Sequence, residues 1–265
     1  MAARQGTDRY LNPHPENAMS PICHIQDLVK VYGAEGGQET VLRGVSFDVE
    51  AGRFVCIMGP SGSGKTTLLH LISGLDEASA GTIELSGEAM HDLSLRARTL
   101  LRRRTVGYVF QFFNLLSNLN VIENVGLPLA IAGRPPSDQE KVVPPLLERF
   151  GIAQRKDAFP YQLSGGEMQR TSIARALAGG QPLLLCDEPT GNLSQKAGLE
   201  VMETLRGVCD NDGRTVLLVT HNPRDAAFAD EVLFLVDGQI SSGRRLKGPG
   251  ITVEDVHEAL AALSI

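Results

Sequence analysis

The sequence lacks several features that would mark other classes of protein. It has only four cysteines in 265 residues, and none is paired at a metal-ligand spacing. Two of them lie inside apolar runs and two stand alone, so buried or free thiols are expected instead of disulfides or zinc ligands. No apolar run approaches the roughly 20 residues that a transmembrane helix needs. The N-terminus has no apolar signal-peptide core, which predicts a cytosolic protein.

Concentrated positive charge is also missing. The formal net charge is −6, and lysines and arginines are dispersed apart from a triple arginine at residues 102–104. A nucleic-acid surface needs a basic patch or stripe, so no nucleic-acid partner is expected. The sequence contains no internal repeat or low-complexity block. With 42% hydrophobic residues, the chain can bury a sizeable core in one domain, or in one domain with an insertion.

One stretch matches the pattern G-x-x-x-x-G-K-[ST] of a phosphate-binding loop. It consists of Gly59, Pro60, Ser61, Gly62, Ser63, Gly64, Lys65, Thr66 and Thr67. An apolar run at residues 53–58 predicts a strand before it, and residues 65–75 predict a helix after it. A glycine-rich turn that fits by chance is the alternative, but this context favours a functional loop.

The chemistry of this loop predicts ATP and Mg²⁺ as ligands. Glycines let backbone N–H groups turn inward around a polyphosphate, and the following helix adds its unpaired N-terminal donors. Lys65 is expected to place its charge on the β- and γ-phosphates, and Thr66 to hold Mg²⁺ through its hydroxyl.

The rest of the chain alternates strand and helix patterns, as in an α/β nucleotide-binding core. The predicted strands cover residues 22–31, 41–49, 53–58, 81–85, 105–110, 183–186, 215–220, 231–236 and 239–240. The predicted helices cover residues 65–75, 93–104, 167–178 and 253–263, the last with Thr252 as its N-cap. Between Phe112 and Pro160, helical pieces are expected to break at residues 133–136 and at Pro144-Pro145. A loop is expected at residues 34–39.

Downstream, the pentapeptide Leu163-Ser164-Gly165-Gly166-Glu167 resembles the signature of ATP-binding-cassette (ABC) ATPases. The resemblance spans roughly residues 22–240. It implies an α/β phosphate-loop NTPase of the ABC-ATPase fold, with a RecA-like, mostly parallel sheet, an N-terminal antiparallel β-subdomain and an inserted α-helical subdomain. The expected organisation is a flexible leader (1–21), the ATPase domain (22–242, with the helical insertion at about 112–165), and a C-terminal linker with a short helix (243–265).

The resemblance also implies roles for single residues. Asp187, at the end of an apolar strand, is expected to bind Mg²⁺, and Glu188 to act as the catalytic base on the attacking water. His221 is expected to contact the γ-phosphate and hold the catalytic carboxylate, and Gln111 to meet both Mg²⁺ and the water. Tyr32 matches the aromatic residue that stacks on adenine, although a core-packing tyrosine is a competing interpretation.

A second anion-binding surface is formed by the signature residues Leu163, Ser164, Gly165, Gly166 and Glu167. A single bound nucleotide needs only one such surface. By resemblance, the signature residues close over the γ-phosphate held by another subunit, so a head-to-tail homodimer with two ATP molecules is expected. One departure is Ser194, where the family commonly has aspartate; its effect on communication between the two sites is left open.

The stretch from Gln111 to Leu129 resembles the subgroup that powers lipoprotein release, macrolide export, antimicrobial-peptide resistance and cell-division complexes. The expected function is therefore a transport-coupled, Mg-dependent ATPase at the cytoplasmic face of the membrane, attached to a separate permease. Transmission of force without transport is one alternative, and a soluble ABC protein acting on DNA or ribosomes is another. The substrate, its direction of movement and the identity of the permease do not follow from the sequence.

Overall fold

The structure, a computed structural model, describes residues 21–34 and 37–264. The predicted leader therefore lies, apart from its last residue, outside the described residues. Within these ranges no helix combines the length and apolar character that a membrane crossing requires.

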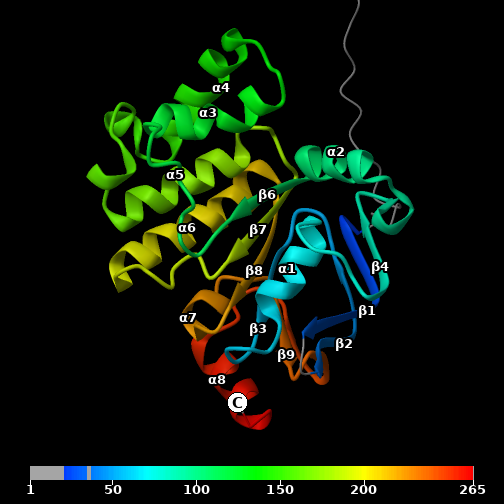
Figure 1. Cartoon of the computed structure of the whole chain (residues 1–265). Helices are drawn as coiled ribbons and strands as arrows, with labels where there is room; N and C mark the ends of the chain where they lie inside the picture. Colours follow the sequence, from blue (N-terminus) through cyan, green and yellow to red (C-terminus); the bar gives the residue numbers. More distant parts are fainter. Residues whose placement is uncertain (1–20, 35–36, 265) are drawn as a thin grey trace, which may run out of the picture.

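Two sheets form the framework (Figure 1). The antiparallel sheet has the order β2-β1-β4-β5, from Gly37–Val49, Cys23–Ala34, Ala80–Leu85 and Glu88–Ala89. The second sheet has the order β10-β9-β3-β8-β7-β6, from Gln239–Lys247, Glu231–Val236, Phe54–Met58, Thr215–Thr220, Leu183–Asp187 and Val106–Val109. All neighbours in this sheet are parallel except the edge strand β10, which is antiparallel to β9. The predicted α/β fold class is confirmed.

Three central strands of the second sheet, β3, β7 and β8, are buried along their whole length. Strands covered on both faces read as continuous apolar runs, and this explains their sequences. Their side chains alternate between two cores: Val55 and Ile57 pack with α1 (Lys65–Ser73) and the antiparallel sheet, whereas Cys56 and Met58 pack on the opposite side. The parallel sheet is thus the middle layer of the molecule (Figure 1).

The remaining helices cover the sheets or project from them. They are α2 (Leu95–Thr105), α3 (Val121–Ile131), α4 (Pro136–Arg149), α5 (Gly165–Leu177), α6 (Gln195–Asp212), α7 (Pro223–Ala226) and α8 (Val253–Ala262), with 3₁₀ turns at Met90–Asp92, Ala153–Arg155 and Pro160–Gln162. Helices α3 and α4 pack on each other and on α5, at the top left of Figure 1. The last helix, α8, packs on α7 and β10, and its N-cap is Thr252, as predicted.

The predicted helix break at Pro144-Pro145 is wrong, because α4 runs through both prolines. A proline inside a helix costs about 3 kcal/mol, since it removes a hydrogen bond and its ring crowds the preceding turn. Val143 and Leu147 lie one turn apart on either side of the prolines, and both are buried in the core. Their burial outweighs the local preference of proline.

Other differences concern where elements begin and end. The expected loop at residues 34–39 is shorter, because β1 continues to Ala34 and β2 already starts at Gly37. Thr105 ends α2 instead of starting a strand, and β10 extends past Gly243 to Lys247. Helix α6 was not predicted; Ser194 is its N-cap and accepts a hydrogen bond from the Ala197 N–H.

All four cysteines are free thiols with buried side chains, as expected. Burial raises the pKa of the Cys23, Cys56 and Cys186 thiols, and it raises the pKa of Cys209 to about 11. A thiol reacts as its thiolate, so these groups are inert in the folded protein.

Candidate nucleotide-binding site

The candidate site lies where three parallel strands end at the same edge of the sheet. Strands β3 and β8 are paired with Met58 opposite Thr220, and β7 and β8 with Asp187 opposite Val219. The residues that follow each strand therefore emerge side by side: the phosphate loop after β3, Glu188 after β7 and His221 after β8. Ligands of open α/β sheets bind at this carboxyl edge.

The loop between β3 and α1 has the shape and unused donors that an anion needs. A Cβ added to Gly59 would stand 2.1 Å from the Leu235 carbonyl oxygen, so no side chain fits there. Helix α1 starts after Gly64, at φ 101°, with neither a side-chain cap nor an acidic residue in its first turn. The buried Ser63 hydroxyl has no hydrogen-bond partner. These free donors and the helix dipole fit the phosphates of a nucleotide.

Lys65 crosses this loop. Its Nζ donates to the carbonyl oxygens of Gly59 and Pro60, each at 2.9 Å, and lies 3.9 Å from Glu188 Oε1. Burial lowers the pKa of Lys65, whereas the nearby Glu188 and Asp187 carboxylates oppose that shift. The ammonium thus stands between the loop and the two acids, where a phosphate would give it a stronger partner than two carbonyls.

Thr66 and Asp187 form a small set of oxygen ligands. The Thr66 hydroxyl donates to Asp187 Oδ1 at 3.1 Å, and the Tyr108 hydroxyl lies 3.5 Å from Asp187 Oδ2. Burial raises the pKa of Asp187, which is 7% exposed, and the hydrogen bond from Thr66 opposes this effect. A hydroxyl and a carboxylate beside a phosphate site suit a hard cation such as Mg²⁺. Within the described part of the chain, no group of three or more His, Cys, Asp or Glu side chains forms a separate metal site.

Glu188 stands in an unusual backbone conformation next to His221. Its φ is 42°, a left-handed value that is strained for a residue with a side chain. Its Oε2 lies 2.9 Å from His221 Nδ1. Gln111 reaches the same place from the end of β6: a Cβ added to Gly191 would lie 3.2 Å from Gln111 Nε2 and 3.7 Å from Glu188 Oε2. The structure therefore brings Glu188, His221 and Gln111 together.

Tyr32 lies beside α1 instead of in the core. Its hydroxyl donates to Asp76 Oδ2 at 2.6 Å, and Lys30 Nζ stands 4.6 Å from the centre of its ring. The hydrogen bond to Asp76 raises the pKa of the Tyr32 hydroxyl, and the nearby Thr67 hydroxyl opposes this shift. The contact with Thr67 places the ring next to the phosphate loop, and the tyrosine remains exposed.

The signature residues are organised around the start of α5 and not around the phosphate loop. Ser164 caps the helix because its hydroxyl oxygen accepts a hydrogen bond from the Glu167 N–H at 3.3 Å. Its own N–H and hydroxyl each donate to Glu167 Oε2 at 2.8 Å. Arg155 donates to Glu167 Oε1 at 2.9 Å. The hydrogen bond from the Ser164 N–H is the main reason that the pKa of Glu167 falls to about 2. Leu163 is buried, whereas Ser164 is exposed.

Several contacts of the site were not predicted from the sequence. They involve Tyr108 at Asp187, Lys30 and Asp76 at Tyr32, and Asp225, which accepts hydrogen bonds from the residues around His221. Tyr108 and Asp187 come from different strands, and Asp76 lies 44 residues after Tyr32, so no local pattern signals these contacts. Lys30 shares β1 with Tyr32, and Asp225 lies five residues after Thr220, so these pairs are near in the sequence and still carry no recognised motif.

The glycine-rich loop between a central parallel strand and a helix, with Thr66 and Asp187 beside it, defines a phosphate-loop nucleotide-binding protein. The profile of the family described as "ABC transporter" matches residues 42–191. The lipoprotein-releasing system ATP-binding protein LolD 2 of Caulobacter vibrioides is 44% identical over 224 residues, 84% of this chain and 98% of that protein. The macrolide export ATP-binding/permease protein MacB of Escherichia coli strain K12 is 42% identical over 222 residues, 84% of this chain and 34% of that longer protein.

Solved structures give the same result. The dimeric structure of MJ0796, a bacterial ABC transporter cassette, resembles this chain with a TM-score of 0.79 and 36% identity, covering 86% of this chain and 99% of that one. A post-hydrolysis dimer of the same cassette, bound to ADP and Pi, has a TM-score of 0.78. The chain belongs to the ABC transporter family, and it is an ATP-binding and ATP-hydrolysing subunit of that family.

Proposed function

We propose that two copies of this chain pack head to tail and hydrolyse two Mg-ATP molecules at their interface. The observation that carries this proposal is the separation of two anion-binding surfaces in one chain. Asp187, Glu188 and His221 lie around the phosphate loop. The side chains of the signature form a separate set of hydrogen bonds, from Ser164 and from Arg155 to Glu167. A second copy would bring its signature to the open side of the bound phosphates.

Each residue then has a distinct task in phosphoryl transfer. Lys65 exchanges its carbonyl partners for β- and γ-phosphate oxygens. Thr66, Asp187 and Gln111 would hold Mg²⁺, which would neutralise charge that develops on the phosphate oxygens. Glu188 accepts a proton from the attacking water as the new P–O bond forms and the bond to the leaving ADP breaks. His221 orients the Glu188 carboxylate through Nδ1, which leaves Nε2 for the γ-phosphate.

Tyr32 is proposed to stack on the adenine ring. Tyr32→Ala is expected to raise the KM for ATP about fivefold, because an aromatic contact contributes roughly 1 kcal/mol beyond area burial. Tyr32→Phe is the matched control: it keeps the ring and loses only the hydrogen bond to Asp76. Steady-state ATPase kinetics of the three proteins test this, and an unchanged KM in Tyr32→Ala would show that the ring does not bind the base.

We further propose that the chain works on the cytoplasmic face of a membrane, driving a separate permease. LolD 2 and MacB are described as parts of lipoprotein-releasing and macrolide-export systems. The segment after Gln111 offers a docking surface: Phe112 is 70% exposed, and Phe113 and Asn114 both have positive φ. Arg175 on α5 donates to the carbonyl oxygens of Phe113 and Asn114, at 2.9 and 2.6 Å, and holds the segment in place.

Co-expression with a candidate permease tests this partner. A tag on the membrane protein is expected to co-purify this chain, and Phe112→Ser is expected to weaken capture at least tenfold by removing an aromatic anchor. Leu95→Ser on α2 is the control, since Leu95 is 76% exposed on another surface. Equal capture of both variants would place the contact elsewhere. A captured complex that hydrolyses ATP and transports no substrate would favour the alternative of force transmission.

A further inference from the structure

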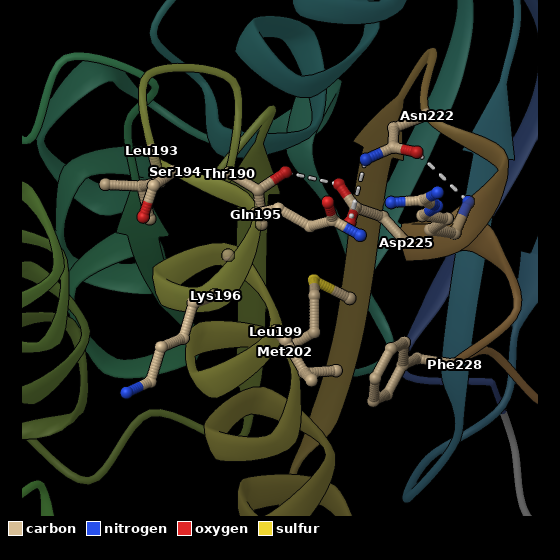
Figure 2. Close-up of a pocket in the computed structure, with 12 residues that line it drawn as sticks. Thr190, Leu193, Ser194, Gln195, Lys196, Leu199, Met202, Asn222, Asp225 and Phe228 are labelled. Carbon is tan, nitrogen blue, oxygen red and sulfur yellow. Dashed lines mark hydrogen bonds between the residues drawn. The ribbon is translucent and has the colours of Figure 1, made fainter.

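Two loops of the candidate site are tied together at a second point, away from the Glu188–His221 contact. They follow the neighbouring strands β7 and β8. Two residues beyond Glu188, the Thr190 hydroxyl donates to Oδ2 of Asp225, which lies on α7 four residues beyond His221. Figure 2 shows this hydrogen bond between Thr190 and Asp225 as a dashed line.

Asp225 also holds both neighbours of His221. The Thr220 hydroxyl lies 3.4 Å from Asp225 Oδ2. Asn222 Nδ2 donates to Asp225 Oδ1 at 3.2 Å (Figure 2). The Asn222 N–H donates in turn to the Thr220 hydroxyl at 3.0 Å. Asp225 is only 4% exposed, so water competes little with these hydrogen bonds. One buried carboxylate therefore fixes the turn that carries His221.

The loop after Glu188 needs such a restraint because packing does not supply it on this side. A pocket of about 780 Å³ opens beside Thr190 and Asp225, with Leu193, Met202 and Phe228 among its other walls (Figure 2). Glu188 itself has the positive φ of 42°, a conformation that costs on the order of 1–3 kcal/mol and persists only when its surroundings hold it. Within the loop, the Gly191 N–H closes a turn onto the Glu188 carbonyl oxygen at 3.1 Å.

We propose that Asp225 and Thr190 are positioning residues for ATP hydrolysis: their hydrogen bond locks the loop of Glu188 to the loop of His221. The inference rests on the proposed roles of Glu188 and His221. Neither Thr190 nor Asp225 contacts the nucleotide in this arrangement. Loss of the link therefore lowers the rate of the chemical step and leaves ATP binding unchanged.

Thr190→Val tests the link because valine keeps the shape of threonine and removes only the hydroxyl. Its kcat is expected to fall about tenfold, since a small misplacement of a catalytic group costs up to roughly 100-fold. The KM for ATP stays within about twofold, because no contact with ATP is lost. Thr190→Ser restores the hydroxyl and is expected to restore kcat. Thr204→Val is the matched control, since the Thr204 hydroxyl bonds to the Glu200 carbonyl oxygen on the outer helix α6.

A second measurement distinguishes positioning from a general loss of stability. In a His221→Ala background, Thr190→Val is expected to cause less than a twofold further loss of kcat, because the contact that it protects is already gone. Asp225→Asn, which keeps one acceptor oxygen, is expected to lower kcat as Thr190→Val does, with a melting temperature close to that of the unmodified chain.

Three results would overturn the inference. They are an unchanged kcat in Thr190→Val, a Thr190→Ser variant as slow as Thr190→Val, and fully additive losses in the His221→Ala background. A different result would contradict the proposed function itself, namely ATPase activity that is the same with and without the Lys65 side chain. An active chain with a normal Thr190→Val variant would contradict only the positioning role.

Discussion

Glu188→Gln is expected to lower the kcat for ATP hydrolysis by about 100-fold to 10,000-fold, the range typical of losing a general base. Glutamine keeps the size of the side chain and an oxygen that can accept from His221 Nδ1, which lies 2.9 Å from the carboxylate. It cannot accept the proton of the attacking water. The rate of phosphate release under saturating Mg-ATP measures this loss.

The same variant is expected to form a stable dimer with ATP, because the γ-phosphate contacts that join the two copies are no longer removed. Sedimentation with and without saturating Mg-ATP measures the dimer. Glu203→Gln on the exposed face of α6 is the matched control and should hydrolyse ATP and dissociate like the unmodified chain. A Glu188→Gln protein that stays monomeric with Mg-ATP would contradict the head-to-tail arrangement.

Lys65→Ala is expected to weaken ATP binding by about 100-fold and to abolish turnover, since a charge-assisted hydrogen bond contributes roughly 1.5–3 kcal/mol. The loss follows from the position of Lys65 Nζ, which is bonded to the loop carbonyls and stands 3.9 Å from Glu188. Equilibrium binding of a fluorescent ATP analogue, followed by displacement with ATP, measures the affinity.

A change in folding has to be separated from this effect, because Lys65 is buried. Lys65→Met keeps most of the side-chain volume and removes the ammonium group with its two hydrogen bonds to loop carbonyls, so it should fold with a similar melting temperature and still fail to bind ATP. Lys196→Ala, on the surface of α6, is the control for removal of a lysine. Normal hydrolysis by a folded Lys65→Met protein would rule out the assigned phosphate site.

The parts of the site that were predicted from the sequence depend on local patterns. An apolar strand ends before Gly59, another ends at Asp187 and a third before His221, and parallel strands bring their carboxyl ends to one edge. The resemblance to ABC ATPases implied that these residues act at one site, and the parallel strand pairing explains why they meet. The fold class was predicted from the alternation of strand and helix patterns and from the resemblance to ABC ATPases.

What could not be predicted depends on contacts between distant segments. Pro144 and Pro145 indicate a break, but the burial of Val143 and Leu147 keeps α4 intact. Asp225 carries no local signal of its role, because its partner Thr190 is 35 residues away in the chain. Only the pairing of β7 with β8 brings the two together.

The burial of every cysteine makes this protein a suitable starting point for thiol labelling. The unmodified chain has four thiols, all inaccessible and protonated in the folded state. A cysteine introduced at an exposed position without an assigned role, such as Ser137 on α4, is therefore the single reactive thiol of the folded molecule. A spectroscopic probe or cross-linker attached there reports distances between two copies without first removing any native cysteine.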